Sequence, residues 1–454
     1  MTAATIGGSR APSLNLPFII GASSVGTLIE WYDFYIYGVL AAVFATHFFP
    51  QGNVFFATLA TWAVFWFGFI LRPFGALLFG HLGDLIGRKF TFMLTLIMMG
   101  AATFLVGCVP SYATWGIAAP ILIVLMRAIQ GLALGGEYGG AATYIAEHAP
   151  DGRRGLYTSW IQTTATMGIV LALLVVLICR QSMSPAAFND WGWRVPFWLS
   201  AILVVLSGYI RLKLAESPLY ARLKDQGKAS SNPVKETYNT RKNWGLMAFA
   251  LFGATAPEGV VWYTSQFYAL VFLTGILGAA NYPTIYTIMM VALTIGSLGF
   301  LFFGWLSDKI GRRPIMSAGF ALAVLTYWPV FTWLGTFKDS PIVLTLLVLY
   351  LVILVTMVYG PIAAFLVELF PARIRYSSMS MPYHIGNGWY GGCVPFIDTL
   401  LTGATGIALG GLFYPMAVAA IGVVVSQAFR REPTHHIRIW EEVGGEPPLV
   451  PDQP

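Results

Sequence analysis

Charged residues are scarce in this chain. Only 10% of its 454 residues are Asp, Glu, Lys or Arg, whereas a soluble domain has about 25%. Hydrophobic residues make up 57% and aromatic residues 15%. This composition is typical of a polytopic helical membrane protein and argues against a soluble domain. The net charge of +6 then belongs to loops that face an anionic lipid leaflet, and no basic patch alternating with aromatic residues suggests nucleic-acid binding.

Cysteine and enzyme motifs are scarce as well. The three cysteines, Cys108, Cys179 and Cys393, lie in or at the end of apolar runs with no His beside them, so we expect neither a disulfide nor a metal site. The sequence contains no His-Glu-x-x-His, Gly-x-Ser-x-Gly or paired His motif. We therefore predict neither catalytic residues nor a cofactor. Because no short apolar region with a small-x-small cleavage site opens the chain, the first helix is expected to remain as an anchor.

Long apolar runs alternate with charged or Pro/Gly-rich breaks. Because about 20 apolar residues suffice to span a bilayer, the runs predict twelve transmembrane spans. They cover residues 17–43, 54–79, 90–109, 117–143, 156–179, 195–212, 244–273, 283–306, 314–336, 341–366, 377–402 and 406–429. Lys and Arg cluster in one alternate set of connections, and the opposite set holds only Arg180, Arg194 and Lys338. This asymmetry places both termini and the long central connection in the cytoplasm.

The central polar stretch divides the chain into two similar halves. We predict a cytoplasmic segment over 1–16, a six-helix bundle over 17–212, a cytoplasmic linker over 213–243, a second six-helix bundle over 244–429 and a cytoplasmic tail over 430–454.

Two loop sequences recur in the two halves in the same order. GHLGDLIGRK at 80–89 returns as GWLSDKIGRR at 304–313, and AEHAP at 146–150 returns as VELFP at 367–371. The offsets are 224 and 221 residues. A duplicated six-helix unit, with halves related by an axis along the membrane normal, is the plan of parallel-repeat transporters.

The repeated loop Gly-x-x-x-Asp-x-x-Gly-Arg-[Lys/Arg] resembles the signature loop of the major facilitator superfamily. Five further motifs resemble its metabolite–proton symporter family, which includes bacterial carriers of citrate, 2-oxoglutarate, shikimate and proline/betaine. They are EWYDF at 30–34, RPFG at 72–75, RAIQGLALGGE at 127–137, WGWRVPF at 191–197 and ESP at 216–218. The resemblance implies an all-α fold with twelve transmembrane helices in two pseudo-symmetric bundles. It also implies a multi-pass protein of the bacterial cytoplasmic (inner) membrane.

Three acids fall inside the predicted spans of the first half, where a charge costs about 2.5–3.5 kcal/mol on insertion scales. Glu30 and Asp33 share one helical face with Tyr37, because the three are spaced i, i+3 and i+7. Asp33 is our first candidate for the proton carrier, followed by Glu30 and Glu137. Each is expected to pair with a guanidinium in some state. The alternative is that all three are permanently paired structural charges and the carrier is a uniporter.

Arg127 and Arg72 are the cations that match these acids. A guanidinium can hold a carboxylate bidentately, so Arg127 either grips a substrate carboxylate or pairs with an acid of the first span. Gln130 lies near the same stripe of its helix, and the interleaved glycines 131, 135, 136, 139 and 140 are expected to let helices approach closely. Arg72 either pairs with an acid of the first span or lines the inner cavity.

The second half adds further candidate ligands. Tyr263 and Gln266 lie one turn apart on one helical face and can hydrogen-bond a polar ligand, and His384 and Asn387 are expected to line the cavity. Together with Tyr37, Arg72, Arg127 and Gln130 they form the predicted substrate-binding set. Glu258 fits no simple role: it is either a second protonation site or a residue that faces water.

The repeated loops are expected to act in switching. By the resemblance, they pair with acids at the inner ends of neighbouring helices and hold the cytoplasmic side shut. The predicted gate residues are Asp84, Arg88, Glu147, Arg153, Asp308, Arg312, Glu368 and Arg373. The first loop has Leu85 where many relatives have Arg, which weakens the expected gate of that half.

The predicted function is uptake of a small organic acid, a carboxylate, in symport with a proton. The protein would act as a monomer in the lipid bilayer, with the proton as coupling ion and no other cofactor. The alternatives are a carrier of betaine or proline, a sugar-like carrier and a uniporter. A membrane sensor needs a soluble signalling domain, for which the linker and the tail are too short.

Overall fold

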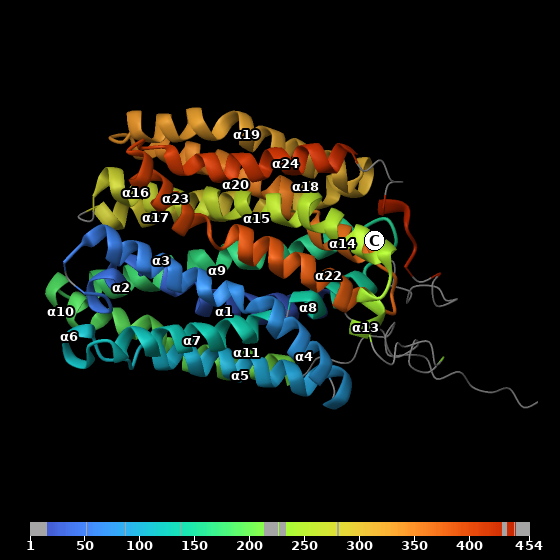
Figure 1. Ribbon diagram of the computed structural model, residues 1–454, viewed down its shortest axis with the longest axis horizontal. Coiled ribbons are helices and arrows are strands. Elements are labelled where there is room, and N and C mark those ends of the chain that lie inside the picture. Colours follow the sequence, from blue (N-terminus) through green and yellow to red (C-terminus); the bar gives the residue numbers. More distant parts are fainter. Residues whose placement is uncertain are drawn as a thin grey trace, which may run out of the picture.

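The computed structural model of this chain describes residues 16–50, 52–86, 88–136, 138–212, 226, 233–278, 281–428, 434–439 and 441. Every regular element in these ranges is a helix, and most helices run along one common direction (Figure 1). Most of the predicted linker and tail lie outside the described residues, and so does Glu137.

The first half of the chain forms one layer, drawn in blue to green in Figure 1. Its elements are α1 (Leu16–Val39), α2 (Ala41–His47), α3 (Val54–Ile70), α4 (Arg72–Ile86), α5 (Arg88–Val106), α6 (Tyr112–Trp115), α7 (Ala118–Gly135), α8 (Tyr138–His148), α9 (Arg154–Ser182), α10 (Pro185–Asp190), η1 (Gly192–Arg194) and α11 (Val195–Leu212). Helices α1, α9 and α11 pack together, and α7 packs against α3, α4 and α5.

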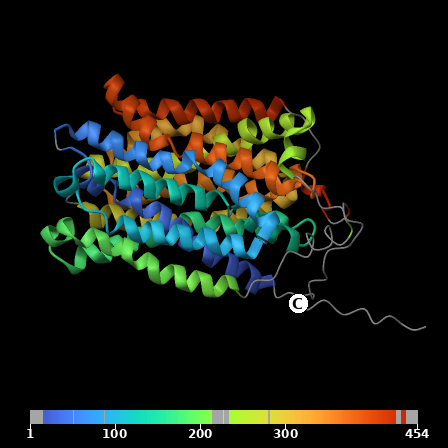
Figure 2. The ribbon, with the colours of Figure 1, turned by 60° about the horizontal axis from the view of Figure 1, so that its bottom comes forward.

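The second half forms the other layer, drawn in yellow to red, and the view of Figure 2 shows its helices following the same direction. Its elements are α13 (Pro233–Tyr238), α14 (Arg241–Ala250), η2 (Leu251–Thr255), α15 (Ala256–Tyr263), η3 (Thr264–Tyr268), α16 (Ala269–Leu277), α17 (Tyr282–Gly296), α18 (Leu298–Ile310), α19 (Arg312–Thr336), α20 (Pro341–Tyr359), α21 (Ile362–Leu369), α22 (Arg375–Tyr383), η5 (His384–Gly391), α23 (Val394–Thr405), η6 (Gly410–Leu412), α24 (Phe413–Ala428) and η7 (Thr434–His436). The stretches η2, η3 and η5 are π-helical and continue the α-helices beside them.

Many of these helices are long and apolar enough to cross a membrane. By length and hydropathy, nine helices among the described residues qualify, or ten if Ser23–Val39 and Ala41–His47, bent by 56°, form one span. The predicted third span is represented by a shorter apolar helix, Met93–Val106. The predicted span 377–402 is divided among α22, η5 and α23, because a π-helical stretch and a turn interrupt it.

The two halves meet along two seams. On one side α9 packs against α17 and α18, and on the other side α3 and α4 pack against α22, η5 and α23. Pairs of helices from opposite halves therefore enclose the centre of the molecule, where the side chains considered below lie.

Backbone contacts between glycines position the helices of the first half. A Cβ atom added to Gly131 of α7 would lie 1.8 Å from the carbonyl oxygen of Gly68 in α3, and one added to Gly135 would lie 2.1 Å from that of Arg72. Because no side chain fits in these gaps, α7 lies directly against the α3–α4 segment. The expectation that these two glycines serve helix packing is confirmed, and the contact brings Arg72 and Arg127 close to the centre.

We predict that Gly131→Ala lowers the free energy of unfolding by about 1–3 kcal/mol, since the added carbon forces the two backbones apart. Thermal unfolding of the purified protein in detergent measures the change. Gly245→Ala is the matched control, because nothing lies within 4 Å of the added carbon. Equal melting temperatures for the two variants would show that the close approach is unimportant.

Candidate substrate and coupling site

Arg72 lies at the centre, between the two halves. It begins α4 directly after α3 ends at Ile70, and its side chain is fully buried. Within the described part of the chain, none of its three guanidinium nitrogens has a hydrogen-bond acceptor. The aromatic rings of Trp31, Phe69 and Tyr383 have their centroids 5.4, 5.5 and 5.7 Å from its Cζ atom. A buried cation that is held against aromatic rings without an ion pair is costly and favours an anionic ligand.

The second half places an acid and an imidazole near this cation. Glu258 of α15 is fully buried, and its two carboxylate oxygens accept hydrogen bonds of 3.1 and 2.9 Å from Nδ2 of Asn387 in η5. A Cβ atom on Gly259 would lie 2.7 Å from the carbonyl oxygen of Gly386, so close backbone packing sets this pairing. His384, the first residue of η5, is fully buried, and neither ring nitrogen has a hydrogen-bond partner among the residues described.

Tyrosines line the space around these groups. The hydroxyls of Tyr35 and Tyr263 are 3.5 Å apart across the two halves, and those of Tyr359 and Tyr383 are 2.9 Å apart. The rings of Tyr138 and Tyr383 stack across the halves with centroids 3.6 Å apart. The centre therefore has aromatic walls and a few polar groups, as small-molecule sites commonly do.

Arg127 is also fully buried but lies within the first half. Its Nη1 donates to the carbonyl of Phe34 at 3.2 Å and to Oε1 of Gln130 at 2.9 Å, and Nη2 donates to the carbonyl of Phe65 at 3.4 Å. Its Cζ lies 3.9 Å from the ring centroid of Phe34 and 4.8 Å from that of Tyr37. Neutral groups thus hold this guanidinium, whereas we expected an acid of the first span or a substrate.

Gln130 and Tyr37 belong to the same cluster around Arg127. The amide of Gln130 accepts from Arg127 and donates to Thr103 at 2.8 Å, so both of its ends are occupied. The hydroxyl of Tyr37 donates to the carbonyl of Thr61 at 3.2 Å. These two residues, predicted as substrate ligands, therefore lie in the first half and fix the position of Arg127.

Asp33 occupies a neutral environment. Its side chain is fully buried, and neither carboxylate oxygen has a hydrogen-bond partner by distance and angle in the described ranges. Ser200 of α11 is its polar neighbour, and the hydroxyl of Tyr32 beside it donates to the carbonyl of Pro196 at 2.7 Å. Glu30 is buried as well. No ion pair within 4.0 Å joins Asp33 to Arg72 or Arg127, so the expected pairing is not present in this conformation.

Gln266 lies in η3 and is almost fully buried, and both atoms of its amide are without a hydrogen-bond partner among the described residues. Of the predicted ligands, the structure thus brings Arg72, Tyr263 and Asn387 into the central cluster. It also places there His384, which was expected to line the cavity, and Glu258, which had no assigned part in substrate binding. Their signal was a titratable side chain in an apolar span, but sequence spacing alone does not show which side of a helix faces the centre.

At one end of the molecule, which we predict to be the cytoplasmic end, the two halves are joined by a buried ionic network. Glu368 of α21 pairs with Arg154 at 3.0 Å and with Arg312 at 2.9 Å, and Arg312 pairs with Asp308 at 2.6 Å. The Asp308 carboxylate also accepts the backbone N–H groups of Gly155 and Leu156 at 2.8 and 2.9 Å. An acid at these first N–H groups of α9 is favoured by the helix dipole. The ion pairs and the hydrogen bonds to the N-terminus of α9 therefore hold the two halves together.

At two of the predicted gate positions, a neighbouring arginine forms the buried ion pair in place of the predicted one. Arg153 is exposed, and Arg154, the first residue of α9, enters the network, because adjacent helical residues point about 100° apart. Arg373 forms an exposed pair with Glu236 at 2.5 Å. The buried partner of Glu147 is instead Arg375, at 3.6 Å. The side chains of Asp84 and Arg88 lie outside those that the structure describes.

A short segment of the tail covers this network. Arg154 Nη1 donates to the carbonyl of Ile437 at 3.1 Å, and Ile439 is fully buried. His435 in η7 is nearly buried and lies near Gly311. Burial lowers the pKa of the His435 imidazole below its usual range, and the neighbouring His436 adds to this effect.

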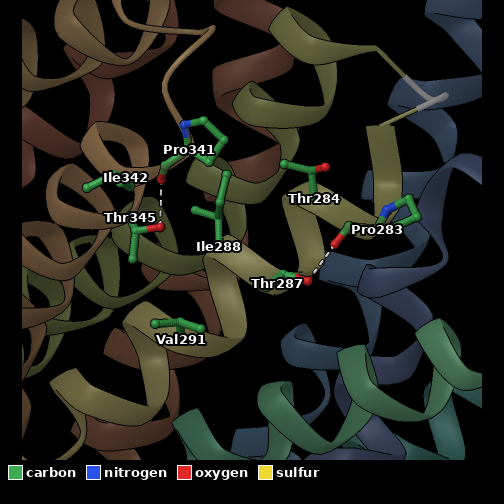
Figure 3. A pocket seen from close by; sticks show the side chains of 8 residues that line it. All are labelled: Pro283, Thr284, Thr287, Ile288, Val291, Pro341, Ile342 and Thr345. Carbon is green, nitrogen blue, oxygen red and sulfur yellow. Dashed lines mark hydrogen bonds between the residues drawn. The ribbon is translucent and has the colours of Figure 1, made fainter.

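A groove of about 350 Å³ lies between α17 and α20, at the ends of these helices away from the ionic network (Figure 3). Its walls are prolines, threonines and aliphatic residues. The hydroxyls of Thr287 and Thr345 donate to the carbonyls of Pro283 and Pro341 at 2.8 and 2.7 Å, as the dashed lines show. With these hydroxyls occupied and Ile342 75% exposed, the groove is suited to lipid contact and unsuited to a polar substrate.

Comparison with known proteins settles the family. The sequence matches the family described as "Sugar (and other) transporter" over residues 19–244 and again over 242–430. It is 36% identical over 418 residues to the alpha-ketoglutarate permease of Escherichia coli (strain K12). This alignment covers 91% of this chain and 93% of that protein. This chain belongs to the sugar and metabolite transporter family.

Other family members and a solved structure agree. The chain is 35% identical over 387 residues to the shikimate transporter of E. coli (strain K12), covering 84% of this chain and 86% of that protein. It is 32% identical over 417 residues to the proline/betaine transporter of Salmonella typhimurium, and the alignment covers 89% of this chain and 81% of that protein. The structure of the major facilitator superfamily proton:xylose symporter XylE, bound to 6-bromo-6-deoxy-D-glucose, superimposes on this protein with a TM-score of 0.74 at 18% identity. The superposition covers 93% of this chain and 98% of that chain. The protein is thus a multi-pass membrane transporter with the major facilitator fold.

We predict that Glu368→Gln loosens the cytoplasmic closure of this transporter. Removing one partner of a buried ion pair costs about 3–5 kcal/mol, and both Arg154 and Arg312 lose a carboxylate. The reporter is a cysteine at Ser159, which is buried where α9 crosses α18. N-ethylmaleimide is expected to label this cysteine at least about tenfold faster, as a shift of 1.4 kcal/mol suffices for that.

The labelling is done in protein whose native cysteines are replaced by Ser. Glu236→Gln serves as control, because its pair with Arg373 is exposed and worth at most about 1 kcal/mol. Equal labelling rates in the two variants would show that the buried network does not hold the inside shut.

Proposed function

We propose that this transporter carries a small organic anion into the cell together with a proton, by alternating access of two six-helix halves whose twelve helices cross a bacterial cytoplasmic membrane. The observation that carries this proposal is the guanidinium of Arg72, which is fully buried between the halves without a hydrogen-bond acceptor in the described residues. A cation held in this way gains most from a ligand with a carboxylate.

The residues around Arg72 suit such a ligand chemically. A carboxylate can accept two parallel hydrogen bonds from the guanidinium fork, while Trp31, Phe69 and Tyr383 provide an apolar wall around it. Tyr263 and Gln266 of the second half are the proposed ligands for the rest of the molecule. Because groups from both halves touch the substrate, its binding favours the state in which the halves approach each other.

The names of the relatives support a carboxylate. Alpha-ketoglutarate, shikimate, proline and betaine differ in size and net charge, but each has a carboxylate group. A carrier of a zwitterion such as betaine is therefore the main alternative. A sugar-like carrier does not need a buried guanidinium, and the likeness to the xylose symporter supports the fold alone.

Asp33 is the proposed proton-binding residue of the first half, with Glu30 as its rival and Glu137 as a third candidate. An ionised carboxylate in a fully buried, neutral environment costs several kcal/mol, and protonation removes this cost. Arg127, held by Phe34, Phe65 and Gln130, is proposed to fix the helices around Asp33. In this proposal Arg127 does not bind the substrate.

Uptake into proteoliposomes tests the substrate class. With an imposed pH gradient, the wild type is expected to accumulate at least one of labelled 2-oxoglutarate, citrate and shikimate in preference to betaine and xylose. Arg72→Gln is expected to weaken its apparent affinity about 10–150-fold, because a hydrogen bond to a charged group is worth about 1.5–3 kcal/mol. Lys338→Gln, at an exposed position, is the control for loss of a positive charge. Unchanged affinity in Arg72→Gln would remove Arg72 from the binding site.

The coupling has a separate test. Asp33→Asn is expected to abolish accumulation driven by the pH gradient and to leave counterflow exchange of labelled substrate intact, since exchange requires no net proton movement. Asp339→Asn removes an exposed acid and is expected to behave as the wild type. If collapse of the gradient leaves wild-type uptake unchanged, the protein is a uniporter and the symport proposal is wrong.

A further inference from the structure

Glu258 combines complete burial with a weak set of partners. Both of its oxygens accept from a single donor, the neutral amide nitrogen of Asn387, at 3.1 and 2.9 Å. No cation forms an ion pair with Glu258 within 4.0 Å in the part of the chain that the structure describes. One bifurcated hydrogen bond from an amide does not replace the hydration of a carboxylate.

Among the side chains that the structure describes, the one charged neighbour of Glu258 is Arg72, which belongs to the other half of the protein. Its electrostatic neighbours on the packed elements are Arg72 of α4, Tyr138 of α8, Tyr263 of α15, Tyr359 of α20 and Tyr383 of α22. His384 of η5 is a further titratable group beside Arg72. The hydroxyl groups are neutral at physiological pH, so the positive charge that acts on Glu258 is that of Arg72.

This arrangement ties the charge of Glu258 to that of the substrate. When the centre is empty, one cation faces one acid, and an ionised Glu258 balances Arg72. When a substrate carboxylate binds Arg72, two acids face one cation in a site of low dielectric. Like charges that share such a site cannot both remain ionised at moderate pH, and the carboxylate held by the guanidinium is the one that stays ionised.

We propose that Glu258 is a second proton-binding residue, which takes up one proton when a substrate carboxylate occupies Arg72 and releases it when the carboxylate leaves. The proton comes from water on the side where the substrate enters, binds a carboxylate oxygen of Glu258, and passes to water on the side where the substrate leaves. No other bond changes. The inference rests on the proposed function and differs from the role of Asp33, which forms no ion pair with any side chain that the structure describes.

Asn387 is the positioning residue in this scheme. Its Nδ2 can donate to the ionised carboxylate, and it continues to donate to the remaining carbonyl oxygen after protonation. The backbone contacts of Gly259 with Gly386 and Asn387 keep the two helices at a fixed separation. Proton uptake by Glu258 therefore needs no rearrangement of α15 against η5.

The pH dependence of binding tests this proposal. Binding of labelled 2-oxoglutarate and shikimate to purified wild-type protein is expected to weaken as the pH rises through the ionisation of Glu258, by about tenfold per pH unit for one linked proton. Glu258→Gln imitates the protonated acid, so its binding is expected to be independent of pH over that range. Asp398→Asn removes another fully buried acid of the second half and is expected to keep the wild-type pH dependence.

Asp33→Asn distinguishes the two proton sites. By the proposed function it loses accumulation, but its binding is expected to keep the pH dependence that Glu258→Gln loses. A Glu258→Gln variant that binds both probes with the wild-type pH dependence would overturn the inference and leave the proposed function intact.

A measurement without substrate separates the two failures. If the wild type neither binds nor transports any of the carboxylates, the proposed function is wrong. Infrared titration without substrate then tests whether Glu258 binds a proton and whether Arg72 affects that protonation. At acid pH the difference spectrum of wild type minus Glu258→Gln is expected to contain a protonated carboxyl band, which disappears as the pH rises and Glu258 ionises. Arg72→Gln is expected to keep that band to higher pH, because the compensating cation is gone. A band that is absent, or unaffected by Arg72→Gln, would refute the inference.

Discussion

A charge that is buried between two protein halves needs an opposite charge nearby. This protein meets that need in one way at the end of the molecule that carries the ionic network and in another way at its centre. At the end that carries the ionic network, the opposite charges belong to the protein itself, because Glu368 pairs with Arg154 of the first half and Arg312 of the second. At the centre Arg72 has no such carboxylate within ion-pair distance among the described residues. The ion pairs of Glu368 hold the two halves together, whereas the buried charge of Arg72 can be balanced by a bound anion.

The all-helical membrane fold and the family were predictable from the sequence because they depend on regular features. Apolar runs, Lys and Arg asymmetry and repeated loops survive small errors in boundaries. Residue contacts do not, since one position along a helix changes its direction by about 100°. This is why the network contains Arg154 where Arg153 was predicted. The expected pairing of Arg127 with an acid is absent for another reason: its acceptors are main-chain carbonyls of Phe34 and Phe65, which have no signature in a sequence.

The π-helical stretches of the second half are the other feature that sequence reasoning missed. His384 and Asn387 lie in η5, Gln266 lies in η3, and Glu258 lies in α15 between η2 and η3. A π-turn changes the angular spacing of side chains and often marks functional positions in a helix. Regular helical spacing therefore does not give the relative directions of these four side chains, although each was visible as a polar side chain in an apolar span.

The contact between Arg154 and the carbonyl of Ile437 makes the end of the chain part of the moving machinery. That bond joins the first half to a segment 283 positions further along the chain, at the end where the ionic network holds the two halves together. A reporter protein attached after residue 428 in place of the natural tail would remove this segment, whereas one attached after residue 454 would retain it. The two fusions are thus different transporters, and expression screens that treat the tail as a neutral attachment point would compare proteins with unequal inner closures.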